Sequence, residues 1–253
     1  MMFIGIDLAW SPHNRSGGAA IRGDTSGGTL VDHTLLDSDA NILAFIDTHA
    51  SGGPCLVGVD APLWVPNESG RRPGEAALAA SFQRYQAGAH PANRRLLARN
   101  GVVRGEALVA ALAERGFTHA PMIEAGAAVR QVIEVFPHPA MIAIFDLPRT
   151  IKYKVKQGRS RAMLEAEWAR YQALLLSLRT ADPPLRGHEQ FVGQTVAGLR
   201  GRALKGYEDQ VDALMCAYIC LYGHRWGAAR CRVFGTMAGG YIFTPVPEVM
   251  RGV

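Results

Sequence analysis

Two short apolar segments, far apart in the chain, each end in an aspartate. The first reads Ile4-Gly5-Ile6-Asp7 and the second Val57-Gly58-Val59-Asp60. A short continuous apolar run is typical of a strand that is covered on both faces, as in a parallel sheet. Ligands of open α/β sheets gather at the carboxyl ends of strands, so we expect both aspartates to face one crevice.

The pattern of the whole chain predicts one α/β domain over residues 1–253, with a helical insertion at 67–128. The opening segments predict an antiparallel meander of three strands, followed by a helix that Asp37 or Ser38 caps. The segments that we expect are strands at 2–8, 19–21, 29–36, 55–59 and 129–136, helices at 140–145, 158–178 and 209–222, and a last hairpin or edge at 232–235 and 240–244.

Three further acidic residues stand in positions that need an explanation. Glu134 lies within Val132-Ile133-Glu134-Val135-Phe136, where a carboxylate is costly to bury without a partner. Asp209 and Asp212 stand three apart at the start of a predicted helix and therefore share one face. Carboxylates that converge from strands and a helix repel one another unless a cation lies between them. Oxygen ligands of this kind suit Mg²⁺ or Mn²⁺, and such ions support phosphodiester cleavage.

Each acid also has a purely structural explanation, which the sequence leaves open. A strand-end aspartate such as Asp7 or Asp60 can accept backbone N–H bonds. Asp209 can favour a helix N-terminus through the helix dipole. Glu134 can pair with an arginine of the middle segment.

The formal net charge is +5, which is compatible with a polyanionic substrate. Basic residues crowd two segments, one containing Arg71, Arg72 and Arg94 and the other containing Lys154. Either cluster can also be an ordinary solvated face.

Several classes of protein are disfavoured. The four cysteines have no zinc-site spacing and are expected to be small core residues in a reducing compartment. No run approaches the roughly 20 apolar residues of a membrane span, and the N-terminus lacks the basic start of a secretion signal. We therefore expect a cytoplasmic protein without a membrane partner, whose oligomeric state, a homodimer included, stays open.

Several segments together resemble the domain-of-unknown-function family 429, described as predicted ribonuclease H-like nucleases. The resemblance spans nearly the whole chain in family order. It is carried by residues 5–10, 58–63, 134–139, 153–154, 209–218 and 240–245.

The resemblance implies a ribonuclease H-like fold similar to that of Holliday-junction resolvases, with a mixed sheet and a C-terminal helix that carries acids. By this similarity Asp7, Asp60 and Asp212 would be metal ligands, Asp209 would be the second acid of the helix, and Glu134 would be the family's own strand acid.

The leading hypothesis is a metal-dependent nuclease or phosphodiester hydrolase that acts on DNA or RNA. Its catalytic acids would be Asp7, Asp60, Glu134 and Asp212, and these four together with Asp209 would be the metal ligands. The predicted contacts to the phosphate backbone come from four basic residues: Lys154, Arg71, Arg72 and Arg94. His138, between two prolines, can shuttle protons or simply cap a segment.

Two other classes of function remain as alternatives. An actin-like nucleotide-binding phosphotransferase would use Gly, Ser and Thr after the first-strand aspartate, and Ser11, Ser16, Gly17 and Gly18 offer a thin version of that pattern. A non-catalytic binding protein would keep the fold without the chemistry.

Overall fold

The computed structural model describes residues 1–251 and is built around one seven-stranded mixed sheet. The strand order is β7-β8-β4-β1-β2-β3-β9. These strands are β1 (Met2–Asp7), β2 (Ser16–Asp24), β3 (Gly27–Leu36), β4 (Cys55–Val59), β7 (Thr118–His119), β8 (Arg130–Glu134) and β9 (Leu185–Arg186).

The first three strands form the predicted antiparallel meander, and β4 and β8 continue the sheet in parallel on the other side of β1. The predicted strand at residues 55–59 is confirmed residue for residue. A meander, a helix, further parallel strands and an acidic C-terminal helix follow in the expected order, consistent with the ribonuclease H-like α/β fold.

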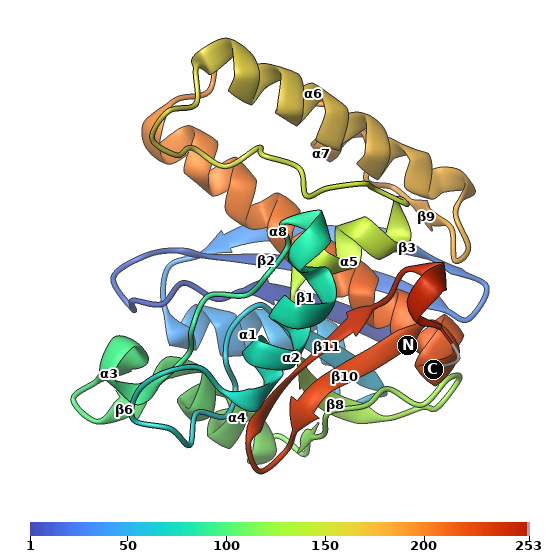
Figure 1. Cartoon of the computed structure of the whole chain (residues 1–253). Helices are drawn as coiled ribbons and strands as arrows, with labels where there is room; N and C mark the ends of the chain where they lie inside the picture. Colours follow the sequence, from blue (N-terminus) through green and yellow to red (C-terminus); the bar gives the residue numbers. More distant parts are fainter. Residues whose placement is uncertain (252–253) are drawn as a thin grey trace.

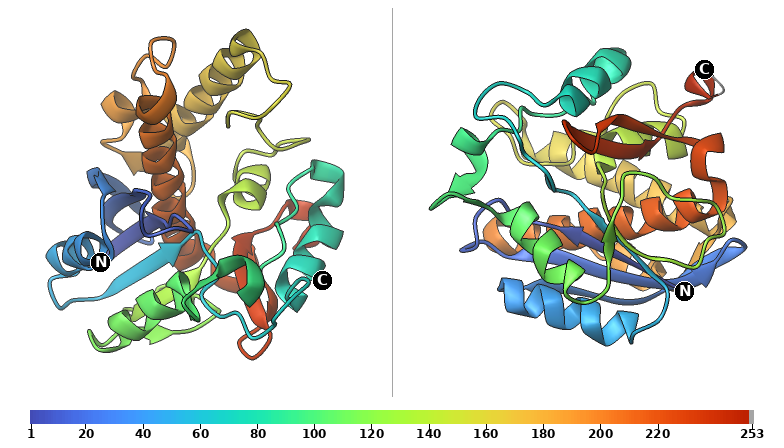
Figure 2. Two further views of the ribbon diagram at one scale, coloured as in Figure 1. Left: turned by 90° about the vertical axis from the view of Figure 1, so that its left-hand side faces the viewer. Right: turned by 90° about the horizontal axis from the view of Figure 1, so that it is seen from below.

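Helices cover both faces of the sheet, as Figures 1 and 2 show. On one face lies α1 (Asp39–Ala50), whose N-cap is Ser38; the hydroxyl of Ser38 accepts a hydrogen bond from Asn41 N at 3.1 Å. On the other face lies α8 (Gly201–Trp226). Two apolar cores result, because alternate strand residues point to opposite faces. Phe3 and Leu56 belong to the core under α8, whereas Ile6 and Val59 belong to the core under α1.

The middle of the chain is only partly helical. Residues 67–128 contain short helices and strands joined by irregular segments, and one of these strands, β7, adds an edge to the main sheet. Its other elements are α2 (Pro73–Phe82), η1 (Gln83–Tyr85), α3 (Arg94–Leu97), β5 (Ala98–Arg99), β6 (Val102–Val103) and α4 (Arg104–Ala113).

The remaining elements surround α8. In Figure 1, α6 (Arg161–Ser177) lies beside α8, and the rings of Trp168 and Tyr207, one from each helix, are 5.0 Å apart. A separate hairpin packs against α2. The elements not yet given are α5 (Pro137–Ile144), η2 (Leu178–Thr180), α7 (Glu189–Val192), η3 (Gly227–Ala229), β10 (Cys231–Thr236), β11 (Gly240–Pro245) and η4 (Glu248–Met250).

All four cysteines are free and buried, as expected for core residues. Within residues 1–251, none of the helices is both long and apolar enough to span a lipid bilayer.

Candidate active site

Asp7 and Asp60 lie side by side at the carboxyl ends of two neighbouring parallel strands. Ile6 of β1 stands opposite Val59 of β4, and the backbone N–H of Asp60 donates to the carbonyl of Ile6 at 2.9 Å. Asp7 lies two residues after Gly5, and Asp60 lies two residues after Gly58. Each aspartate side chain therefore points to the same face of the sheet as its glycine, which is the face that α8 covers. Both residues are half-buried, and neither carboxylate makes a hydrogen bond or an ion pair within the described part of the chain.

Three glycines allow α8 to lie directly on this part of the sheet. A β-carbon at Gly5 would lie 1.9 Å from the carbonyl oxygen of Ala213, and one at Gly17 would lie 1.9 Å from that of Asp209. At Gly58 it would lie 2.6 Å from Sγ of Cys220. Because these three positions on β1, β2 and β4 carry no side chain, the helix approaches the sheet closely there and its acidic residues are held near Asp7 and Asp60.

Asp212 is the fully buried member of this group, and both of its oxygens are engaged. The hydroxyl of Tyr153 donates to Oδ1 at 2.5 Å, and Nζ of Lys154 lies 2.7 Å from Oδ2. Burial alone would lower the pKa of Lys154, but Asp212 and Asp7 outweigh it, so that the pKa is raised and the ammonium form is favoured.

A second lysine neutralises the neighbouring acids of α8. Lys205 Nζ lies 2.6 Å from Oδ1 of Asp209 and 2.7 Å from Oε1 of Glu208. Both carboxylates are buried, whereas the side chain of Lys205 is 60% exposed. The group of five acids (Asp7, Asp60, Glu208, Asp209 and Asp212) therefore contains two ammonium groups. With every member ionised, the acids outnumber the lysines.

The two aspartates without a protein partner have shifted pKa values. Burial, followed by the nearby Asp212 and Asp60, raises the pKa of Asp7 well above its usual range. Burial likewise raises the pKa of Asp60 to about 7; Lys154 opposes this shift and Asp212 adds to it. A cation placed between them would relieve both the desolvation and the repulsion.

Glu134 does not join this group, because it leaves the opposite face of the sheet. Glu134 pairs with Val59 in the register of β4 and β8, and it lies two residues after Val132. Both valines belong to the core under α1, so the Glu134 side chain points to that face of the sheet. Its Oε2 accepts hydrogen bonds from Arg72 Nη1 and Leu63 N, each at 2.9 Å, and Arg72 Nη2 also binds Oε1.

The structure therefore favours the alternative for Glu134, an ion pair with an arginine of the middle segment. Arg72 is 1% exposed and also pairs with Glu75. Its guanidinium is thus a buried structural group, and the expectation that it contacts a substrate is corrected. Glu134, paired with Arg72, therefore offers no free carboxylate for catalysis or for a metal ion.

Asp209 and Asp212 do share one face of a helix, but they do not stand at its start. The helix begins at Gly201, well before Asp209, so an N-terminal dipole does not explain either acid. It extends further back because Leu204 and Tyr207 are buried and Lys205 pairs with the acids of the next turn.

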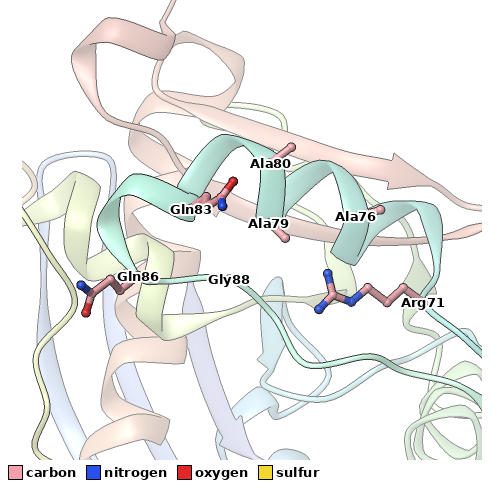
Figure 3. Close-up of a pocket in the computed structure, with 7 residues that line it drawn as sticks. All are labelled: Arg71, Ala76, Ala79, Ala80, Gln83, Gln86 and Gly88. Atoms are coloured by element: carbon pink, nitrogen blue, oxygen red, sulfur yellow. The ribbon is translucent and has the colours of Figure 1, made fainter.

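The remaining predicted substrate contacts are dispersed. Lys154 lies in the acidic group, whereas Arg94 pairs with Glu106 at 3.0 Å. Arg71 is exposed and lines a surface cavity of about 560 Å³ beside α2 (Figure 3). The cavity lining consists of Arg71, Ala76, Ala79, Ala80, Gln83, Gln86 and Gly88.

His138 lies in α5, and its Nδ1 is 3.3 Å from Oγ1 of Thr150. Burial, followed by the charge of Lys154, lowers the pKa of His138 to about 4, so the imidazole is neutral near pH 7. A neutral ring beside the Tyr153 ring, 5.9 Å away, fits a packing role.

Sequence reasoning placed neither Tyr153 nor Lys205 in the site, and it considered Glu208 only as an acid that favours a helix N-terminus. Tyr153 stands next to Lys154 in a segment that resembles the family, and this position could have indicated that Tyr153 belongs to the site. The spacing of Lys205 three residues before Glu208 and four before Asp209 was a second signal, because such pairs meet on a helix.

The donor set fits a hard divalent cation only in part. Within residues 1–251, no group of three or more His, Cys, Asp or Glu side chains is arranged to hold a metal ion. Asp7 and Asp60 offer free carboxylates of the type that Mg²⁺ and Mn²⁺ prefer. Asp212 and Asp209 do not offer theirs, because lysines already neutralise them.

Comparison with known proteins gives a family but no activity. A family model described as "Protein of unknown function (DUF429)" matches residues 5–236. Neither the curated proteins nor the solved structures give a match. The matched segment contains Asp7, Asp60, Lys154 and Asp212, and its extent shows that the chain belongs to this DUF429 family of unknown function.

Proposed function

We propose that the chain is a divalent-metal-dependent phosphodiester hydrolase that cleaves nucleic acid. One observation carries the proposal: Asp7 and Asp60 adjoin at the ends of β1 and β4, half-buried and without a protein partner among residues 1–251. Buried carboxylates normally have partners, and an unpartnered pair is destabilising unless a ligand uses it. A hard cation is the ligand that this pair suits best.

Each group in the site then has a distinct role. Asp7 and Asp60 bind Mg²⁺ or Mn²⁺ in their ionised forms. A cation held there supplies Lewis-acid activation of the phosphoryl group and of water. Lys154, at the edge of the same group with a side chain 28% exposed, presents a positive charge to the phosphate. Asp212 and Tyr153 hold Lys154 in place, and Lys205 holds Asp209.

The phosphotransferase alternative receives less support. Its phosphate-binding turn would need Gly17 and Gly18 in a loop, but both lie inside strand β2. Gly17 is required for the close approach of Asp209, so helix packing accounts for it. Ser16 is buried, and its hydroxyl accepts a hydrogen bond from Ala9 N at 3.1 Å.

The test is cleavage of a panel of labelled substrates: single-stranded and duplex DNA, RNA, an RNA–DNA hybrid and a branched junction. We expect cleavage of at least one substrate with Mg²⁺ or Mn²⁺ and none after chelation. Asp7→Asn and Asp60→Asn should each lower the rate about 100-fold or more, as removal of a preorganised electrostatic group does.

The matched control is Asp37→Asn, which removes a carboxylate that pairs with Arg15 at the surface and is 69% exposed. This variant should cleave at the wild-type rate. ATP turnover without cleavage of the panel would favour the phosphotransferase. A folded protein that binds no Mn²⁺ by calorimetry would favour the non-catalytic binding protein.

A further inference from the structure

The site contains a positively charged side chain, the ammonium group of Lys154. Lys154 Nζ lies 2.7 Å from Oδ2 of Asp212, and the side chain of Asp212 is 0% exposed. The other oxygen of Asp212 accepts the Tyr153 hydroxyl at 2.5 Å. A donor group therefore contacts each oxygen of the carboxylate that α8 would otherwise present to an ion beside Asp7 and Asp60.

The surroundings of Lys154 are those of a shared counterion. Its Nζ is 4.0 Å from Oε1 of Glu208, and the charges of Asp7 and Asp60 also act on it. An ammonium group has three N–H donors, and Asp212 accounts for one of them. The side chain is 28% exposed, so part of it remains open to solvent and to a ligand.

A second divalent ion on Asp212 would have to displace this ammonium. Paired ions in phosphodiester-cleaving sites lie about 4 Å apart and share carboxylate ligands. With Lys154 in contact with Asp212, an ion there would meet a like charge at close range in a poorly solvated place. The remaining acids of the helix, Asp209 and Glu208, are already held by Lys205.

We propose that Lys154 takes the place of a second metal ion, so that the site binds one divalent cation on Asp7 and Asp60. In this arrangement the Lys154 ammonium contacts a non-bridging oxygen of the substrate phosphate. Asp212 and Tyr153 act as positioning residues for that ammonium. The inference rests on the proposed function and specifies how many ions it uses.

The experiment counts Mn²⁺ ions per chain by titration calorimetry and by electron paramagnetic resonance of free Mn²⁺. The wild type should bind one ion, and Asp7→Asn should bind none. Lys154→Met frees Asp212 and should gain a second ion, while its cleavage rate falls about 100-fold or more because the phosphate contact is lost. Lys156→Met is the matched control, because Lys156 is exposed and unpaired within the described structure; it should bind one ion.

A buried Asp212 without a counterion can prevent folding of Lys154→Met, so a second variant is needed. The double variant Lys154→Met/Asp212→Asn removes both charges together and should fold and bind one ion. Two ions in the wild type, or one ion in folded Lys154→Met, would overturn the inference and leave the proposed function standing. No ion in the wild type would instead defeat the proposed function.

Discussion

Gly17 of β2 lies so close to the backbone of Asp209 in α8 that a β-carbon at this glycine would be 1.9 Å from the Asp209 carbonyl oxygen. This contact is between backbones, so no flexible side chain can move aside to accommodate a larger residue. The spacing between the sheet and the acidic part of α8 is therefore set by the absence of a side chain.

We expect Gly17→Ala to lower the free energy of unfolding by about 1–3 kcal/mol, the usual cost of overpacking. Because α8 must shift to relieve the clash, Mn²⁺ affinity should fall as well. The control is Gly198→Ala, since a β-carbon there would meet nothing within 4 Å. Urea denaturation of both variants checks the prediction, which fails if the two lose equal stability.

Arg72 and Glu134 form a buried ion pair, and we expect the loss of Arg72 to destabilise the protein more than the loss of Glu134. Removing one member of such a pair costs about 3–5 kcal/mol, because a buried charge is left uncompensated. Arg72→Met leaves both Glu134 and Glu75 without their ion-pair partner, whereas Glu134→Gln leaves the pair between Arg72 and Glu75 in place. Chemical denaturation should therefore rank Arg72→Met as the less stable variant.

A variant of Glu134 also distinguishes a structural role of this residue from a role in metal binding. Glu134→Gln should leave Mn²⁺ stoichiometry unchanged, because Glu134 faces the side of the sheet away from Asp7. A folded Glu134→Gln protein that binds no Mn²⁺ would return Glu134 to the ligand set.

Much of the architecture could be predicted from local pattern. The strand at 55–59 and a cap of α1 at Asp37 or Ser38 were predicted from apolar runs and cap chemistry; the strand is confirmed, and the cap is Ser38. The start of α8 could not be predicted, since Gly206 is a poor helix former by itself. It is tolerated because Leu35 packs against that position, where a β-carbon would lie 2.8 Å from its Cδ1.

The candidate site was predictable only where a strand end determined it. Asp7 and Asp60 follow directly from the two apolar segments. Whether Glu134 points toward Asp7 and Asp60 depends on the strand register. Glu134 pairs with Val59 and not with Asp60, and this difference of one residue places its side chain on the opposite face of the sheet. The ion pair between Lys154 and Asp212 joins residues far apart in the chain, which no local pattern specifies.

The raised pKa of Asp60 gives a signed pH dependence. In the folded protein Asp60 keeps its proton up to about pH 7, whereas an unfolded aspartate loses it near pH 4. Between these values the folded state binds more protons, so stability falls as pH rises. The difference in unfolding free energy between wild type and Asp60→Asn, measured with chelator present, should therefore decline from about pH 4 to about pH 7.

Mn²⁺ should reverse this trend, because the ion binds the carboxylate form and stabilises the folded protein more at higher pH. A difference between wild type and Asp60→Asn that stays constant with pH would contradict the raised pKa.

The cysteine thiols should be inert in the native protein. All four are buried, and burial raises the pKa of each, that of Cys55 to about 12. The reactive species is the thiolate, which is scarce under these conditions. We expect no labelling by an aromatic disulfide reagent until denaturant is added. Rapid modification of a thiol in the folded state would show that a cysteine is accessible.

Tyr153 and Tyr171 provide a matched pair for measuring how firmly Asp212 is held. Their rings are 4.6 Å apart and both are fully buried. The Tyr153 hydroxyl donates to Asp212, whereas that of Tyr171 has no hydrogen-bond partner within residues 1–251. Tyr153→Phe should cost about 1.5–3 kcal/mol, the value of a hydrogen bond to a charged group. Tyr171→Phe should be neutral or stabilising, because it removes an unsatisfied polar atom. Equal losses in urea denaturation would mean that the Tyr153 hydroxyl does not hold Asp212, and that Lys154 is positioned without it.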